Sequence, residues 1–317
     1  MPITARDLIE EPSHYGRWRR KVDLLVNSGR FEEALELCDQ IDAWAEARPD
    51  KRYRDQAFCW RAGVLIATGD GDRAAPRLRR ILMGHSHPIP QLSAAYYLSL
   101  HHDGRGESEK SRLYARRALR HARECGLARC LIRCLNLYAN CLFKDGEYSA
   151  AARGYDEALA LQASPPAEGE SDHPDWIRGV LMANLGGSLV LLDRPREALG
   201  YLAEALECLD RQPEGLRSDA LVRRVLLGLS FGYLNLERPL IAGRYARWAL
   251  EDGGEPVTDQ VRKGGLFLLG EASKLAGSEE RALVYYSSLQ EEFYPDMPDV
   301  VNLLLLTDAR GLVNIWE

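Results

Sequence analysis

Cysteine and histidine side chains gather on one predicted helix and raise the question of a zinc site. Cys130, Cys134 and Cys141 lie at positions i, i+4 and i+11 of that helix, with Cys125 and His121 just upstream. Structural zinc sites usually combine two closely spaced cysteines in a turn with a second pair elsewhere, and the chain has no Cys-x-x-Cys pair. Because cysteine packs as a small apolar residue, we interpret these as packing residues and expect no metal and no other cofactor.

Two histidine pairs stand at the two ends of another predicted helix. His85 and His87 precede it, and His101 and His102 follow it. A helix of about 12 residues is roughly 18 Å long, so side chains from its two ends are too far apart to bind one metal ion. We therefore interpret both pairs as solvated loop histidines.

The Gly-Asp-Gly-Asp segment at 69–72 is the nearest approach to a calcium-binding loop. An EF-hand needs more oxygen ligands and a glutamate at its twelfth position, which this segment does not supply. The sequence also lacks a phosphate-binding loop, a dinucleotide-binding glycine fingerprint, a Gly-x-Ser-x-Gly elbow and a His-Glu-x-x-His segment. We therefore predict a turn at 69–72 and a protein that is not an enzyme.

Basic residues form three clusters, each interleaved with apolar residues on a predicted helix. The clusters are Arg17, Arg19, Arg20 and Lys21; Arg77, Arg79 and Arg80; and Arg112, Arg116, Arg117, Arg120 and Arg123. The whole chain nevertheless carries a formal charge of −6, which disfavours non-specific binding to nucleic acid. We interpret the clusters as solvated helix faces, with an acidic protein or a nucleic acid as the alternative partner.

The composition is that of an ordinary globular protein. Of 317 residues, 46% are apolar and 28% charged, and no apolar run approaches the ~18 residues that a membrane helix needs, so we expect no membrane partner. Seven cysteines argue against a disulfide framework and for a reducing compartment. The first ten residues contain no apolar signal segment, so we expect a cytoplasmic protein.

A repeated pattern organises most of the chain. Its clearest copy spans residues 135–161, with a small residue at Ala139, a turn glycine at Gly146, an alanine at 151 and a Tyr155-x-x-Ala158 ending. Small residues suit places where two antiparallel helices approach closely, and glycine suits the turn between them. The residue after each turn recurs 37 to 47 positions apart, at Ala34, Ala74, Ser111, Ala151, Ala198, Ala242 and Ala282.

This pattern resembles the tetratricopeptide repeat, in the long-repeat form found in bacterial regulators. The spacing averages about 41 residues against 34 in the standard motif, so the helices or their connections must be longer. The resemblance covers roughly residues 15–293. It implies an all-α, right-handed α-solenoid of about seven helix pairs, plus a C-terminal helix.

The resemblance divides the chain into three parts. Residues 1–14 are an N-terminal extension, 15–297 the repeat array and 298–317 a C-terminal packing helix. The proline-rich segment 164–174 is the longest insertion, and we expect no domain boundary there. Apolar residues between Val300 and Trp316 cover more than one helical face, so we expect this helix to be buried on several sides and to form a homodimer.

In tetratricopeptide arrays the first helix of each unit lines a concave groove, where peptide-binding members use asparagines and basic residues. The corresponding candidates here are Arg133, Asn136, Asn140, Lys144, Asn184, Arg224 and Phe231. Asn140, Asn184 and Arg224 fall at positions of the carboxylate clamp of that family, whereas the position of its remaining lysine holds Asn136. Alternatively, the asparagines face water or cap a neighbouring helix.

The resemblance therefore implies a non-catalytic scaffold that binds a protein or peptide segment in its groove. One alternative is a peptide-responsive regulator of a signalling or transcription factor. The bacterial phosphatase regulators resemble this chain only from the repeats onward, because they carry an N-terminal helical bundle where only about 14 residues stand here. The other alternative is a repeat protein whose arginine faces bind nucleic acid.

Overall fold

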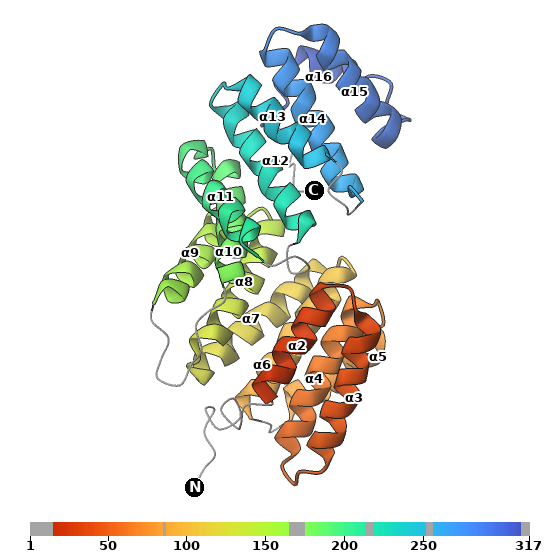
Figure 1. Ribbon diagram of the computed structural model, residues 1–317, viewed down its shortest axis with the longest axis vertical. Helices are drawn as coiled ribbons and strands as arrows, with labels where there is room; N and C mark the ends of the chain where they lie inside the picture. The colour runs from red at the N-terminus through yellow and green to blue at the C-terminus, as the bar shows by residue number, and fades with distance from the viewer. Residues whose placement is uncertain (1–14, 85–86, 165–174, 213–217, 252–255, 312–317) are drawn as a thin grey trace. The chain divides into compact units, whose positions relative to one another are not determined.

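The computed structural model describes residues 15–84, 87–164, 175–212, 218–251 and 256–311, and within these ranges the regular secondary structure is entirely helical. The helices are α2 (Tyr15–Asn27), α3 (Phe31–Glu46), α4 (Lys51–Ala67), α5 (Gly71–Met83), α6 (Pro88–Gly104), α7 (Ser108–Cys125), α8 (Ala128–Lys144), α9 (Tyr148–Ala163), α10 (Asp175–Leu191), α11 (Pro195–Asp210), α12 (Asp219–Asn235), α13 (Pro239–Leu250), α14 (Asp259–Leu275), α15 (Glu279–Phe293) and α16 (Val300–Leu306). Figure 1 shows them in chain order, and the all-α prediction is confirmed.

Short turns join these helices into hairpins and repeat one geometry along the chain. In the turn from α8 to α9, Gly146 has φ +77° and the N–H of Glu147 donates to the carbonyl of Leu142 at 2.9 Å. This six-residue closure is a Schellman cap, which needs a left-handed residue just after the helix. Glycine supplies that conformation at most of these turns, whereas Asp193 and Glu237 adopt it at φ 56° before a proline-initiated helix.

The small anchor residues predicted from the repeat are core residues. All seven are buried: Ala34, Ala74, Ser111, Ala151, Ala198, Ala242 and Ala282. Glycine serves the same purpose at the closest approaches. A Cβ on Gly270 would lie 2.2 Å from the ring of Tyr286, which is fully buried. Each hairpin therefore depends on small residues on one helix beneath a large side chain of the other.

The chain forms two compact units, Met1–His173 and Pro174–Glu317. In unit 1, consecutive helices from α2 to α9 pack on each other, and α4 also contacts α2 and α6. In unit 2 the same pattern runs from α10 to α16, with α12 also contacting α10 and α14. The division falls within the proline-rich segment where we expected no boundary, and 165–174 lie outside the described residues.

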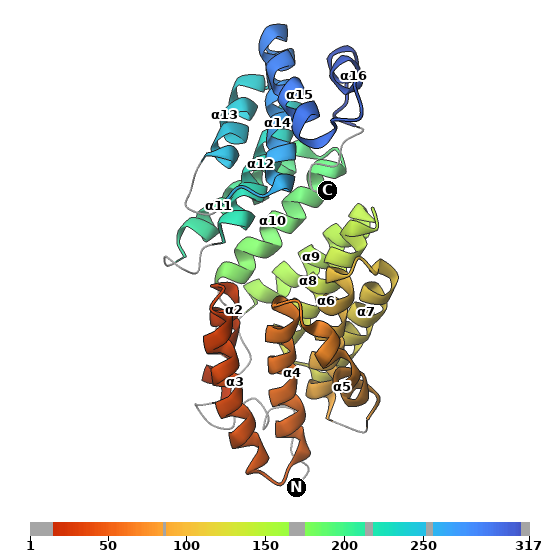
Figure 2. The same cartoon turned by 90° about the vertical axis from the view of Figure 1, so that its right-hand side faces the viewer.

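The C-terminal helix is shorter and less buried than predicted. It covers only Val300–Leu306, beside α15 (Figure 2), and of its residues only Leu304 is buried. Leu306 is 86% exposed. Lys274 ties this helix to α14, because its Nζ donates to the carbonyls of Leu304 and Thr307 at 2.6 and 2.8 Å. The predicted segments 1–14 and 312–317 lie outside the described residues.

Among the described residues, none of the helices combines the length and apolar character that crossing a bilayer requires.

Candidate partner-binding surface

Four of the predicted site residues share one face of α8 in unit 1. Arg133, Asn136, Asn140 and Lys144 are three, four and four residues apart, a spacing that places them in one row along a helix. The first three are half-buried and Lys144 is exposed. We call this row the α8 stripe. It is the part of the predicted site that the structure brings together.

Arg133 reaches beyond its own hairpin. Its Nη1 lies 3.6 Å from the Asp23 carboxylate of α2, and its guanidinium lies 5.0 Å from the ring centroid of Tyr96 on α6. Burial alone would lower the pKa of Arg133, but the Asp23 charge and the neighbouring tyrosines Tyr96 and Tyr97 raise it above its ordinary value. Arg133 is therefore a permanent cation held between a carboxylate and an aromatic ring.

Lys144 and Asn140 make contacts at closer range. Lys144 Nζ donates to both carboxylate oxygens of Asp103 on α6, at 2.6 and 2.8 Å. Asn140 Oδ1 accepts a hydrogen bond of 2.7 Å from the hydroxyl of Tyr155 on α9. Asn140 thus connects the two helices of its own hairpin through a side-chain hydrogen bond.

Sequence reasoning missed the aromatic residues beside Arg133. Tyr96 and Tyr97 are half-buried on α6, with ring centroids 5.5 Å apart in an edge-to-face arrangement. The ring of Tyr97 covers Gly63 of α4, where a Cβ would lie 2.6 Å from it. The repeat frame was able to identify Tyr96 as a position equivalent to Asn136. Tyr96 stands 15 residues before the anchor Ser111, and Asn136 stands 15 residues before the anchor Ala151.

The remaining candidates belong to unit 2. Asn184 is half-buried on α10 and Arg224 is exposed on α12. Phe231, predicted to line the groove, is only 3% exposed and packs in the core of unit 2. That prediction was wrong because α12 is buried over most of its circumference, so helical spacing alone does not show which side is open.

Comparison with solved structures identifies the architecture. The apo form of RapI aligns with a TM-score of 0.64 at 12% identity, over 95% of this chain and 83% of that one. NprR in complex with its cognate peptide NprX gives 0.61 at 12% identity, covering 93% and 82%. A signal transduction ATPase with a tetratricopeptide repeat sensor from Pyrococcus horikoshii gives 0.60 at 18% identity, covering 94% of this chain and 44% of that one.

This chain has a tetratricopeptide-type fold. At identities of 12% to 18%, the structural similarity concerns the fold alone. No protein-family model and no curated protein sequence matches the chain.

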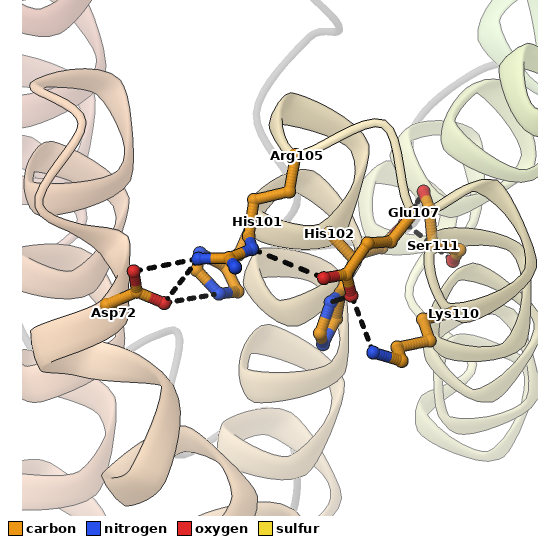
Figure 3. A network of polar contacts seen from close by, with 8 residues as sticks. Asp72, His101, His102, Arg105, Glu107, Lys110 and Ser111 are labelled. Atoms are coloured by element: carbon orange, nitrogen blue, oxygen red, sulfur yellow. Dashed lines mark hydrogen bonds and ion pairs between the residues drawn. The ribbon is translucent and has the colours of Figure 1, made fainter.

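The histidines of the third tetratricopeptide hairpin are not solvated, which corrects the prediction for His101 and His102. They are 7% and 4% exposed because α6 continues to Gly104 and carries both into the packed end of the hairpin. His102 Nδ1 lies 2.7 Å from a Glu107 oxygen, and His101 Nε2 lies 3.5 Å from Asp72 (Figure 3).

This polar network joins neighbouring hairpins of the fold. Arg105 donates to Asp72 on α5 at 2.8 and 2.9 Å and to Glu107 at 3.3 Å (Figure 3). Hydrogen bonds from Lys110 and His102 hold the pKa of Glu107 down at about 2. The His85 position lies outside the described residues, and His87 instead accepts from the N–H of Ile89 at the start of α6.

The cysteines of α7 and α8 behave as packing residues. Cys134 and Cys141 are buried, and burial raises the pKa of both thiols, as it raises that of Cys125 to about 12. Buried thiols of this kind pack as small apolar groups. Within the described ranges, no three potential ligands come close enough to hold a metal ion.

Part of the arginine-rich face of α7 is exposed. Leu113, Arg116, Arg117 and Arg120 line an open hollow of about 440 Å³. Arg112, by contrast, bridges to the turn before α9 by donating to Asp145 and Glu147 at 2.8 and 2.6 Å. The third basic cluster is therefore partly a connection between hairpins and partly a solvent-facing surface.

Proposed function

We propose that the chain is a non-catalytic scaffold that binds a protein or peptide segment on the α8 stripe. The observation that carries this proposal is the alignment of a guanidinium, two carboxamides and an ammonium along one side of α8, whose opposite side is buried. From Arg133 to Lys144 the row is roughly 16 Å long, which is the length of about five residues of an extended peptide.

The chemistry of the stripe suits a peptide. A carboxamide offers both a donor and an acceptor, so Asn136 and Asn140 are able to bind a peptide bond in the manner of a neighbouring strand. Guanidinium and ammonium groups bind carboxylates through short, charge-assisted hydrogen bonds. NprR, which has the same fold, was solved with a peptide bound, and this supports the proposal by analogy of architecture.

The same likeness supports a narrower version, in which the bound segment makes the chain a peptide-responsive regulator. Asn184 and Arg224 are then a second contact surface, located in unit 2. We also propose a homodimer through α16, because Leu303 and Leu306 are exposed apolar residues on a helix that is held in place by Lys274.

A second candidate function is binding of nucleic acid by α7. It is favoured by Arg116, which has no ion-pair partner within the described part of the chain. Phosphate contacts give a steep loss of affinity between about 50 and 200 mM salt, whereas a peptide contact on the α8 stripe responds weakly. A salt titration of the recovered complex therefore separates the two functions.

The experiment for the main proposal is an affinity pull-down from a bacterial lysate with quantitative mass spectrometry. The immobilised proteins are the wild type, Asn136→Ala, Lys144→Ala and the control Arg153→Ala, whose side chain is exposed on α9. We expect a partner that is recovered by the wild type and the control and depleted from both α8 variants. Equal recovery by all four proteins would contradict a binding role for the stripe.

A further inference from the structure

The ion pair between Asp23 and Arg133 joins two hairpins that are not neighbours. Asp23 belongs to α2 in the first hairpin and Arg133 to α8 in the fourth, with two hairpins between them. In a stack of helical repeats each unit contacts only the next, so the fold does not require this pair. A partly exposed ion pair also contributes little to stability.

The other cation of the stripe provides a comparison. Lys144 pairs with Asp103, and the helices that carry them, α8 and α6, belong to successive hairpins. That pair lies where a repeat array normally connects its units. The Asp23–Arg133 pair, by contrast, reaches the stripe from a distant part of unit 1.

Arg133 has an aromatic ring on one side and a carboxylate within ion-pair distance. Tyr96 lies under the guanidinium at 5.0 Å, and Tyr97 lies beside Tyr96. An aromatic ring fixes the plane of a guanidinium and leaves its N–H groups available for a carboxylate. Asp23 now supplies that carboxylate, at 3.6 Å, while also lying 3.5 Å from Nε of Arg19 on its own helix.

We propose that Arg133 is the anchor for a carboxylate side chain of an acidic peptide segment, and that Asp23 occupies the place of this carboxylate until the partner displaces it. The proposal rests on the proposed function, because it names the chemistry of the segment bound by the α8 stripe. Asp23 then acts as an internal competitor. The apparent association constant for the segment is the intrinsic constant multiplied by the fraction of molecules in which Asp23 does not pair with Arg133.

Release of Asp23 needs little rearrangement. Asp23 and Arg133 have side chains 34% and 28% exposed, so both ends of the ion pair are in contact with solvent. Arg19, four residues earlier on α2, remains as the ion-pair partner of the displaced Asp23 carboxylate. The competitor therefore leaves Arg133 without leaving a buried, unpaired charge behind.

The test measures the binding of two fluorescein-labelled probes, octa-glutamate and octa-glutamine, by anisotropy with the full chain. Asp23→Asn removes the competing charge, and Asp156→Asn removes the same charge from an exposed position on α9. Arg133→Gln removes the anchor, and Arg153→Gln is its matched control on α9. Arg133→Lys keeps the charge without the planar fork, and circular dichroism checks the fold of every variant.

We expect octa-glutamate to bind and octa-glutamine not to bind. Asp23→Asn should bind octa-glutamate about two- to five-fold more tightly than Asp156→Asn, which corresponds to release of an ion pair of about 0.5–1 kcal/mol. Arg133→Gln should bind at least about ten-fold more weakly than Arg153→Gln, with Arg133→Lys in between.

Three results would overturn the proposal: no binding of octa-glutamate, equal affinity of the Asp23 and Asp156 variants, or equal affinity of the Arg133 and Arg153 variants. None of these results tests the proposed function, which the pull-down with Asn136→Ala tests separately. Loss of the pull-down difference together with intact octa-glutamate binding at Arg133 would instead remove the proposed function and leave an anion site.

Discussion

The hydroxyl of Tyr155 donates a hydrogen bond to the side-chain oxygen of Asn140 at 2.7 Å, across the two helices of one hairpin. Tyr286 does the same to the buried carboxylate of Glu271 at 2.5 Å, with the same separation of 15 residues. The tyrosine of the repeat pattern thus reaches from the second helix to a polar residue of the first. Asn140 therefore has a structural role in addition to its proposed role in binding.

The first prediction follows from this hydrogen bond. Asn140→Ala should lower the free energy of unfolding by about 0.5–1.5 kcal/mol, because the Tyr155 hydroxyl loses its acceptor. Tyr155→Phe should cost a similar amount, and the double variant should cost less than the sum of the two. Urea unfolding measures all three. Full additivity would show that the two side chains do not interact.

The second prediction concerns the packing of the fourth hairpin. Ala158 is completely buried on α9, so Ala158→Leu should overpack the hairpin and cost about 1–3 kcal/mol. In a repeat array the damage should stay local, so amide-exchange protection should fall in α8 and α9 before distant helices. The exposed Ala160 on the same helix supplies the control, Ala160→Leu. A uniform loss of protection along the chain would argue against the repeat assignment.

The third prediction is a pH dependence of stability. Burial lowers the pKa of His101, with further lowering from His102, Arg105 and Arg79 that outweighs the opposing effect of Asp72. The folded-state pKa then lies below the unfolded value of about 6.5, so on acidification the unfolded chain takes up the proton first. The contribution of neutral His101 to the free energy of unfolding is therefore present above about pH 6.5 and is lost as the pH falls below that value.

The check is a series of urea titrations between pH 7.5 and 5. The wild type should lose stability towards pH 5, and His101→Gln should lose it with a smaller slope, whatever its stability at pH 7.5. Burial lowers the pKa of His87 in the same direction, so part of the slope should remain. Identical slopes for the two proteins would contradict the assignment to His101.

The sequence predicted the repeat frame correctly because that frame depends on local requirements. A small residue is needed where helices touch, as at Ala151, and a residue with positive φ is needed at each turn, as at Gly146. The same frame failed for His101 and Phe231, because it locates turns and anchors without showing how far a helix continues or which side its neighbours cover.

The Asp23–Arg133 pair lay beyond sequence reasoning for a different reason. The two residues are 110 positions apart, and nothing in the spacing of the repeats brings their hairpins together. The α8 stripe itself was predictable, because Arg133, Asn136, Asn140 and Lys144 follow helical periodicity on a single helix. Their partners Asp23, Asp103 and Tyr155 all come from other helices and required the structure.

The fourth prediction concerns the attachment of α16. Lys274→Met removes hydrogen bonds to the carbonyls of Leu304 and Thr307 and leaves Glu271 with one partner fewer. Amide exchange in α16 should accelerate markedly, while α10 to α12 keep their protection. Lys263→Met, at another half-buried lysine of α14, is the control on the same helix. Unchanged exchange in α16 would show that Leu304 packing alone holds the helix.

The fifth prediction tests the proposed homodimer. Leu306→Glu places a charge on the exposed apolar face of α16 and should convert a dimer into a monomer, because burying an unpaired charge in an interface is costly. Light scattering over a range of concentrations measures the mass directly. A wild-type protein that stays monomeric at high concentration would remove the homodimer from the account.

The central claim is that the α8 stripe binds the partner, and calorimetric titration of the recovered partner segment tests it most directly. Asn136→Ala should weaken binding about two- to twelve-fold and Lys144→Ala about ten- to a hundred-fold, as expected for losing a neutral or a charged hydrogen bond. The control Arg153→Ala should bind as the wild type does. Wild-type affinity in both α8 variants, with weakened binding in Arg116→Gln, would contradict the claim and place the partner on the arginine-rich face of α7.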